Sequence, residues 1–203
     1  MIFGARFCYD IRLISKKKKL ETEKQLLDDV KGGSQAAMHR LYERYVGYAM
    51  AVALRYVPLR DDAEDVVQES FVKFFSNIAS FDFRGEGSLK AWLLRIVVNE
   101  AISMTRKQSR LTFVDEVPEE VPDEDPEVER VPPAELTRMI GELPEGYRLV
   151  LNMFVFEQRS HKEIAEQLGI KESSSASQYL RAKKLLAKKI NDYLNTLNEK
   201  EYE

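Results

Sequence analysis

An acidic, proline-rich segment divides this chain of 203 residues. Between Asp115 and Arg130 nine residues are acidic and one is basic, a local charge of −8, and five prolines fall between Pro118 and Pro133. Prolines remove backbone donors and like charges repel, so this stretch cannot bury a core of its own. We therefore expect an extended acidic linker over residues 111–133, with a separate small domain on either side.

The periodic patterns on both sides of the linker are helical. Four helices are predicted before the linker. The first starts with a capping box at Thr22–Gln25 and ends at Gly32 and Gly33, and the second starts at Ser34 and ends at Pro58. The third starts at Asp61 or Asp62, and the fourth starts at Ser88. The predicted apolar stripes are Ala37, Leu41, Tyr45, Tyr48 and Val52; Ala63, Val67, Phe71, Phe74 and Ile78; and Trp92, Ile96 and Ile102. Helical periodicity resumes near Ala134 and no strand alternation appears. We expect an all-α fold, with a helical bundle at 20–110 and a helix-turn-helix bundle at 134–203.

Charge is segregated along the chain although the net charge is only −3. Residues 161–190 carry seven basic and three acidic side chains, a local charge of +4. Residues 1–19 form a basic tail in which Asp10 and Arg12 interrupt the apolar run that a signal peptide would need. No apolar run approaches the roughly 18 residues of a membrane span. We therefore expect a cytoplasmic protein without direct membrane insertion.

Residues able to bind metal or perform catalysis are scarce. Cys8 is the one cysteine, which excludes a disulfide framework and a cysteine-type zinc site. His39 and His161 lie in different halves, without carboxylates at metal-ligand spacing, and are predicted to be surface residues. No nucleophile and base can be paired. We expect no metal, no cofactor and no enzymatic activity.

Residues 161–186 have the pattern of a helix-turn-helix. Gly169 suits the left-handed turn after the first helix, and the second helix is predicted to start near Glu172. That helix would present Ser174, Ser177, Gln178 and Arg181 on one face, and such a face fits a major groove. Ser175 stands where an apolar residue is usual, and we expect it to be buried and bonded to the carbonyl four residues earlier.

Two stretches together resemble a known family. Asp62–Phe75 followed by Phe81–Ile102 resembles the second conserved region of extracytoplasmic-function sigma factors, and Leu143–Ile170 resembles their fourth region. The resemblance extends from about Gln25 to Lys189. The serine-rich start of the second helix is similar to variants common in Bacteroidota. The resemblance implies a factor that binds core RNA polymerase, brings it to a two-part promoter and helps melt the −10 element.

The resemblance also implies partners and site residues. Besides core polymerase and promoter DNA, an anti-sigma factor is expected, and the free protein is expected to be a monomer. Polymerase binding is implied for the acidic face Asp62, Asp65, Gln68 and Glu69, which without the resemblance is typical of a solvated helix start. The residues implied for the −10 element are Phe83, Arg84, Ser88, Arg95, Asn99, Arg106 and Lys107. Those implied for the −35 element are Ser174, Ser177, Gln178, Arg181, Lys183 and Lys184.

Several alternatives stay open on the sequence. Trp92 lies on an apolar stripe and is predicted to be a core residue rather than a base-stacking one. The acidic linker either threads the basic channels of the polymerase or serves as a solvated spacer. A stand-alone helix-turn-helix regulator of the response-regulator type is the second functional reading, although no receiver-domain strands appear before Pro118. A protein-binding helical module is the third.

Overall fold

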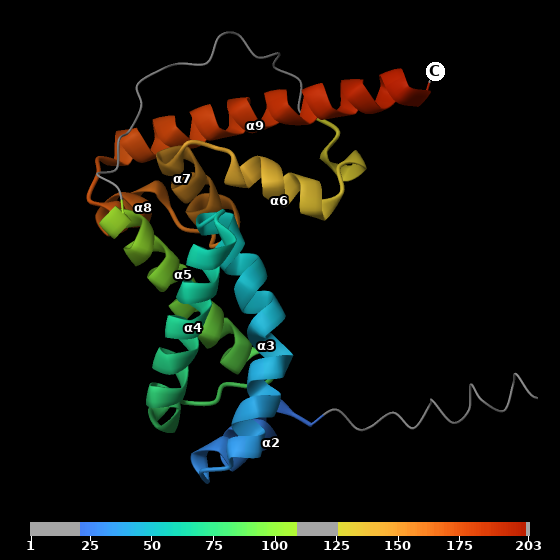
Figure 1. Ribbon diagram of the computed structural model, residues 1–203. Helices are drawn as coiled ribbons and strands as arrows, with labels where there is room; N and C mark the ends of the chain where they lie inside the picture. Colours follow the sequence, from blue (N-terminus) through green and yellow to red (C-terminus); the bar gives the residue numbers. More distant parts are fainter. Residues whose placement is uncertain (1–20, 109–125, 202–203) are drawn as a thin grey trace, which may run out of the picture.

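The computed structural model describes residues 21–108 and 126–201, and within these ranges every regular element is an α-helix or a 3-10 turn (Figure 1). The N-terminal unit contains α2 (Glu23–Lys31), α3 (Gln35–Tyr56), α4 (Arg60–Asn77), η1 (Ile78–Ser80) and α5 (Ser88–Gln108). The C-terminal unit contains η2 (Val128–Arg130), α6 (Pro133–Gly141), α7 (Glu145–Val155), α8 (His161–Leu168) and α9 (Glu172–Glu201). The predicted all-α fold with two helical units is confirmed.

Some predictions fall on other parts of the chain. The basic tail 1–19 and residues 111–125 of the acidic linker lie outside the described residues. No helix in the described ranges combines the length and apolarity needed to span a membrane.

The core of the N-terminal unit lies among α3, α4 and α5, which pack against one another. All five residues of the stripe predicted for the third helix, four on α4 from Ala63 to Phe74 and Ile78 at the start of η1, are buried. Phe74 contacts the ring of Trp92 on α5, with centroids 4.8 Å apart, and Trp92 stacks on Phe81 at 4.7 Å. These aromatic contacts hold Phe81, the first residue of the loop at 81–87, and Trp92 on α5 against α4. The loop is therefore anchored to packed helices.

Three local predictions for this unit are wrong. Helix α4 begins at Arg60 after Leu59 and has no side-chain cap, so neither Asp61 nor Asp62 caps it. Tyr48 was expected on the buried stripe of α3, but its side chain is 53% exposed, and the Lys90 ammonium lies 3.4 Å from its ring centroid. A lysine over an aromatic face is favourable in itself, which accounts for an aromatic residue at this surface position.

The third error concerns the start of α5, where a buried carboxylate takes the place of the predicted serine cap. The Ser88 hydroxyl donates to the Gly85 carbonyl at 2.6 Å and closes the preceding turn. The carboxylate of Glu23, from α2, accepts hydrogen bonds from the backbone N–H groups of Gly87 at 2.8 Å and Leu89 at 3.1 Å. Glu23 is only 2% exposed and also accepts from the Tyr45 hydroxyl. A negative charge at a helix N-terminus satisfies free amides and the helix dipole together.

The helix-turn-helix of the C-terminal unit follows the prediction. Gly169 ends α8 with a left-handed φ of 71°, and α9 starts at Glu172. Ser175 is fully buried as expected, but its hydroxyl bonds to Nδ1 of His161 at 3.0 Å and not to the Lys171 carbonyl. His161 stacks on Phe154, with centroids 4.5 Å apart. His161 is thus half-buried rather than a fully exposed surface residue, whereas His39 is exposed as expected.

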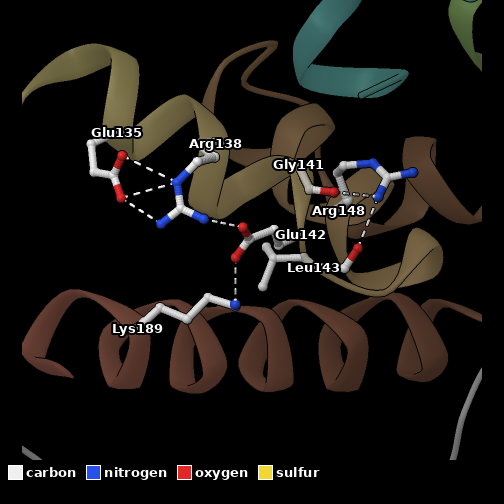
Figure 2. A network of polar contacts seen from close by, with 7 residues as sticks. All are labelled: Glu135, Arg138, Gly141, Glu142, Leu143, Arg148 and Lys189. Atoms are coloured by element: carbon white, nitrogen blue, oxygen red, sulfur yellow. Dashed lines mark hydrogen bonds and ion pairs between the residues drawn. The ribbon is translucent and has the colours of Figure 1, made fainter. Parts of the chain in front are cut away.

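A chain of ion pairs joins α6 to α9 (Figure 2). Arg138 lies between Glu135 and Glu142 and bonds to both, and Lys189 on α9 donates to the other oxygen of Glu142 at 2.7 Å. The Lys189 hydrogen bond is the main cause that lowers the pKa of Glu142, with a further contribution from Arg138. Each pair is partly solvated, so the network contributes less to stability than to the register between the two helices.

The two units contact each other directly. Buried residues of α7 and α8 belong to the same hydrophobic cluster as the core of the N-terminal unit, and α3 contacts both α6 and α7. In Figure 1, α6, α7 and α8 lie between α9 and the ends of the N-terminal helices. The described residues therefore form one closed arrangement.

Candidate nucleic-acid interface

A pocket of about 380 Å³ opens beside the loop at 81–87. It is lined by Ser80, Phe81, Asp82, Arg84, Ser88, Ala91, Trp92 and Arg95. Trp92 and Phe81, stacked on each other, supply aromatic surface, while Arg84 and Arg95 supply positive charge. An aromatic wall, hydroxyl groups and flanking cations are the features that hold an unstacked base and its phosphates.

Only some of the residues predicted to bind the −10 element line this pocket. Arg84 and Ser88 line the pocket, as expected, and Ser88 accepts from the Arg84 N–H at 3.3 Å. Phe83 does not line it: its ring is half-buried, with the Lys24 ammonium 5.8 Å from the centroid. The aromatic residues of the pocket are Phe81 and Trp92, and sequence reasoning had assigned neither to DNA. Trp92 packs against the core as predicted and also borders the pocket.

Three further −10 candidates form a row on one face of α5. Arg95, Asn99 and Arg106 are all exposed along this helix. Their spacing of four and seven residues places them on one side, because an α-helix turns every 3.6 residues. We call these three residues the α5 row. Lys107 belongs to the same helix, but its side chain lies outside the described residues.

The acidic face of α4 contains an apolar residue that the sequence analysis did not single out. Asp65, Gln68 and Glu69 are exposed, and Asp62 is half-buried. Val72 follows Gln68 and Glu69 at helical spacing, and its side chain is 60% exposed. An apolar side chain amid carboxylates is more typical of a protein interface than of a solvated face.

The exposed stripe at the start of α9 is rotated from the predicted one. Its outermost residues are Ser173, Ala176 and Leu180, and Leu180 is 54% exposed. Ser174, Ser177 and Arg181 are half-buried at its border. Gln178 was predicted on the exposed face, but it is only 2% exposed, and its Oε1 has no hydrogen-bond partner.

The two lysines predicted for the −35 element flank this stripe. Lys183 is exposed and Lys184 is half-buried. The face of α9 offered to solvent therefore combines serine hydroxyls, one leucine and lysine ammonium groups. Such a set suits base edges, a thymine methyl group and phosphates respectively.

An apolar groove of about 280 Å³ lies on the C-terminal unit among η2, α6, α7 and α9. Its exposed apolar residues are Val128, Val155 and Phe156. Among its lining residues only Tyr179 and Lys183 carry polar side-chain groups. The groove has the character of a site for an apolar helix face of another protein.

Two family models match the chain, Sigma-70 region 2 over residues 41–111 and Sigma-70, region 4 over residues 134–186. The ECF RNA polymerase sigma-E factor of Haemophilus influenzae is 30% identical over 183 residues, covering 83% of this chain and 95% of the relative. The RNA polymerase sigma factor SigV of Bacillus subtilis is 31% identical over 135 residues, covering 66% and 80%. A solved structure of the sigma factor RpoE in complex with the anti-sigma factor NepR from Bartonella quintana aligns at 23% identity over 73% of this chain and 92% of that one, with a TM-score of 0.44. The chain therefore belongs to the extracytoplasmic-function sigma factors of the sigma-70 family, which are promoter-directing transcription initiation factors and not normally catalytic.

Proposed function

We propose that this sigma factor divides promoter recognition between its two units. Residues 20–110 bind core RNA polymerase and the −10 element, and residues 134–203 bind the −35 element. The acidic segment 111–133 joins them, and residues 1–19 form a separate basic tail. The observation that carries this proposal is the pocket beside the loop at 81–87, next to the α5 row.

In the −10 element, melting requires a base to leave the stack, at a cost of a few kcal/mol. Trp92 and Phe81 give such a base an apolar surface, and Ser88 gives it a polar partner. Arg84 and the arginines of the α5 row bind the backbone of the single strand, together with Lys107. Asn99, an exposed amide amid cations, binds a base edge. Phe83 lies outside the pocket and packs in part against the hydrophobic core, so its contribution is to hold the loop in place.

In the −35 element, the start of α9 enters the major groove. Ser174 and Ser177 contact base edges, and Leu180 contacts a thymine methyl group. Arg181, Lys183 and Lys184 bind phosphates and set the register of the helix. Gln178 is buried beneath this face in the closed arrangement, so it is not part of the proposed surface.

Core polymerase is bound by the face of α4. Asp62, Asp65 and Glu69 pair with cationic side chains of the polymerase, where charge complementarity sets orientation and encounter rate. Gln68 adds a neutral hydrogen-bonding group. Val72 lies among them and supplies the apolar contact that carboxylates alone do not give.

An anti-sigma factor is the expected regulator, and the apolar groove around Val155 and Phe156 supports this part of the proposal because it fits an apolar helix. The serine-rich start of α9, Ser173 to Ser175, is similar to Bacteroidota variants and suggests an origin there. A factor that acts on core polymerase works in the cytoplasm, and we expect a monomer before it meets the polymerase.

The proposal is tested by transcription in vitro with core polymerase from a related bacterium on fragmented genomic DNA. New discrete transcripts that share paired upstream motifs are expected only when this chain is added. Tight duplex binding by the chain alone, without transcripts, would favour the stand-alone regulator instead. Absence of core binding, of transcripts and of duplex binding would leave only the protein-binding module.

The role of Asn99 is tested on a promoter found in this way. Asn99→Ala is expected to reduce permanganate reactivity of the −10 thymines by about ten-fold, because a lost hydrogen bond to a base edge costs about 1–2 kcal/mol. Closed-complex formation should change much less. Asn195→Ala, an exposed asparagine at the far end of α9, is the matched control. Equal losses in binding and in opening would contradict a role in melting.

A further inference from the structure

We propose that the C-terminal unit holds the free protein in an autoinhibited state by partly covering the α5 row, whose side chains stay exposed to solvent but give polar contacts to that unit. This inference rests on the proposed function, since the α5 row belongs to the −10 surface. The contact between the units consists of two parts. One partly covers the row, and the other holds the units together at the end of α3.

The covering part is made by α8 and the turn before it. The Arg106 guanidinium donates to the Gln167 carbonyl at 3.2 Å, and the Gln167 amide donates to Oδ1 of Asn99 at 3.5 Å. Arg95 lines a cavity of about 710 Å³ together with Glu157, Glu163 and Glu166. All three members of the α5 row thus face polar or acidic groups of the C-terminal unit, in the place where the single strand would bring its own acceptors and negative charge.

The holding part is formed by the last turn of α3. Arg148 on α7 donates to the Tyr56 carbonyl at 3.0 Å, and the Asn152 amide donates to the Arg55 carbonyl at 2.9 Å. Arg148 is the same side chain that binds the Gly141 and Leu143 carbonyls at the end of α6 (Figure 2). One guanidinium therefore caps the carbonyl ends of two helices from different units, where a cation is favoured by both dipoles.

This seam has the features of an interface that opens. Among the described residues, four buried side-chain polar atoms lack a hydrogen-bond partner, and three of them lie here: Arg55 Nε, Tyr56 Oη and Asn152 Oδ1. Arg55 also pairs with Glu157 at a distance of 4.0 Å and lies over the Phe156 ring, 4.1 Å from its centroid. A permanent core normally satisfies such groups. Leaving them unpaired lowers the stability of the closed state relative to an open one in which water reaches them.

The geometry at the holding part allows a reversible lock. A Cβ atom built on Gly141 would lie 3.3 Å from the Cβ of Pro58, near the separation that a disulfide bridges. We would introduce Pro58→Cys and Gly141→Cys together with Cys8→Ser, which removes the native thiol. When oxidised, this protein should lose promoter-dependent transcription by about ten-fold or more, because the open state must be populated for binding. Dithiothreitol should restore it to the level of Cys8→Ser alone.

The same site allows a wedge. Gly141→Leu places a side chain against Pro58 and should separate the units, whereas Gly47→Leu, at a helical glycine with open space around it, is the matched control. The free chain is titrated with a pool of fluorescent single-stranded 20-mers of random sequence, and anisotropy is recorded. Gly141→Leu should bind about ten-fold more tightly than the wild type, as expected when a mostly closed population is opened. Gly47→Leu should bind like the wild type.

The outcomes separate this inference from the proposed function. If the oxidised double-cysteine protein initiates transcription as well as its reduced form, autoinhibition is overturned while the sigma activity stands. A wild type that yields no transcripts with core polymerase would overturn the proposed function, and the single-strand titration would still test the covering of the α5 row. Should Gly141→Leu prove unfolded by circular dichroism, the lock alone decides between the alternatives.

Discussion

Glu23 illustrates a residue whose role depends on a partner that is remote in sequence. In the chain it stands inside a capping box, where Thr22 and Gln25 account for the local pattern, and that helix start is confirmed. Nothing nearby indicates that its carboxylate also holds Gly87 and Leu89, more than sixty residues later. Sequence periodicity predicts which faces are buried, but it does not predict which charged group closes the end of a different helix.

Replacing Glu23 by glutamine tests this role. Glu23→Gln turns an amide toward backbone N–H groups, so we expect the free energy of unfolding to fall by about 2–4 kcal/mol, the usual cost of breaking a buried charged partner. Hydrogen exchange at the Gly87 and Leu89 amides, which donate to this carboxylate, should accelerate. Glu43→Gln, an exposed glutamate on α3, is the control and should change stability little. Unchanged exchange at Leu89 would show that the carboxylate does not hold the loop in solution.

Tyr56 allows the seam to be tested at a single atom. Its hydroxyl is buried without a hydrogen bond of good geometry, and burial raises its pKa. Tyr56→Phe removes this unpaired group, so we expect stability to rise by about 1 kcal/mol, since deleting an unsatisfied polar atom recovers its desolvation cost. Chemical denaturation with tryptophan fluorescence measures it. Tyr48→Phe, at an exposed tyrosine, should have no effect. A loss of stability in Tyr56→Phe would indicate a bond to Glu157 in solution.

At the scale of the element, helix starts and stripes were predictable where the chain itself supplies the signal. Gly169 and the start of α9 at Glu172 are confirmed, as is the stripe of α4. Which side of α9 faces the solvent was not predictable, because serines occupy both the exposed and the buried sides of this helix. Only the packing against α8, through Ser175 and His161, decides which serines face outward. The prediction consequently placed Gln178 outside and overlooked Leu180.

The two kinds of contact expected on α9 differ in salt dependence. In the assembled polymerase on a −35-containing promoter, Lys184→Ala should lower affinity similarly for all sequences and reduce the salt slope by about one. Leu180→Ala should leave that slope unchanged and weaken binding by about ten-fold where a thymine methyl group is contacted. Binding measured at several salt concentrations distinguishes the two. A changed slope in Leu180→Ala would contradict its apolar role.

The ion pairs between α6 and α9 give a prediction on pH. Lys189 and Arg138 lower the pKa of Glu142. A carboxyl group whose pKa is lower in the folded chain stabilises the fold above its unfolded value of about 4.3, and this contribution is lost as the pH falls through the folded pKa. The melting temperature of Glu142→Gln should therefore lie below that of the wild type near neutral pH and approach it in acid. Asp192→Asn, an exposed acid on α9, should show a smaller difference at neutral pH. A difference in melting temperature between Glu142→Gln and the wild type that does not change with pH would contradict the ion pairs of Glu142.

For the whole molecule, the sequence predicted two helical units and their order but not how they meet. Hydrophobic periodicity reports the buried face of each helix, whereas the contact between Gln167 and Asn99 joins a half-buried and an exposed polar residue from different units. The residues that hold the seam, Arg148 and Asn152, have no distinctive spacing either. Their partners are backbone carbonyls, which any sequence offers. Such contacts are absent from the pattern of side chains, so only the structure reveals them.

Helix α9 continues without interruption from Glu172 to Glu201. Its start carries the stripe around Leu180, and eighteen residues after Glu172 its Ile190 packs with Leu194 and with Val131 beside η2. A straight helix has no joint, so it acts as a lever about 27 Å long between these points, and a tilt of about 10° displaces the far point by about 5 Å. Binding of the start of α9 in the DNA major groove would therefore move Val131, near the end of the acidic segment. The position of α9 on the promoter and the position of Val131 are thus expected to change together.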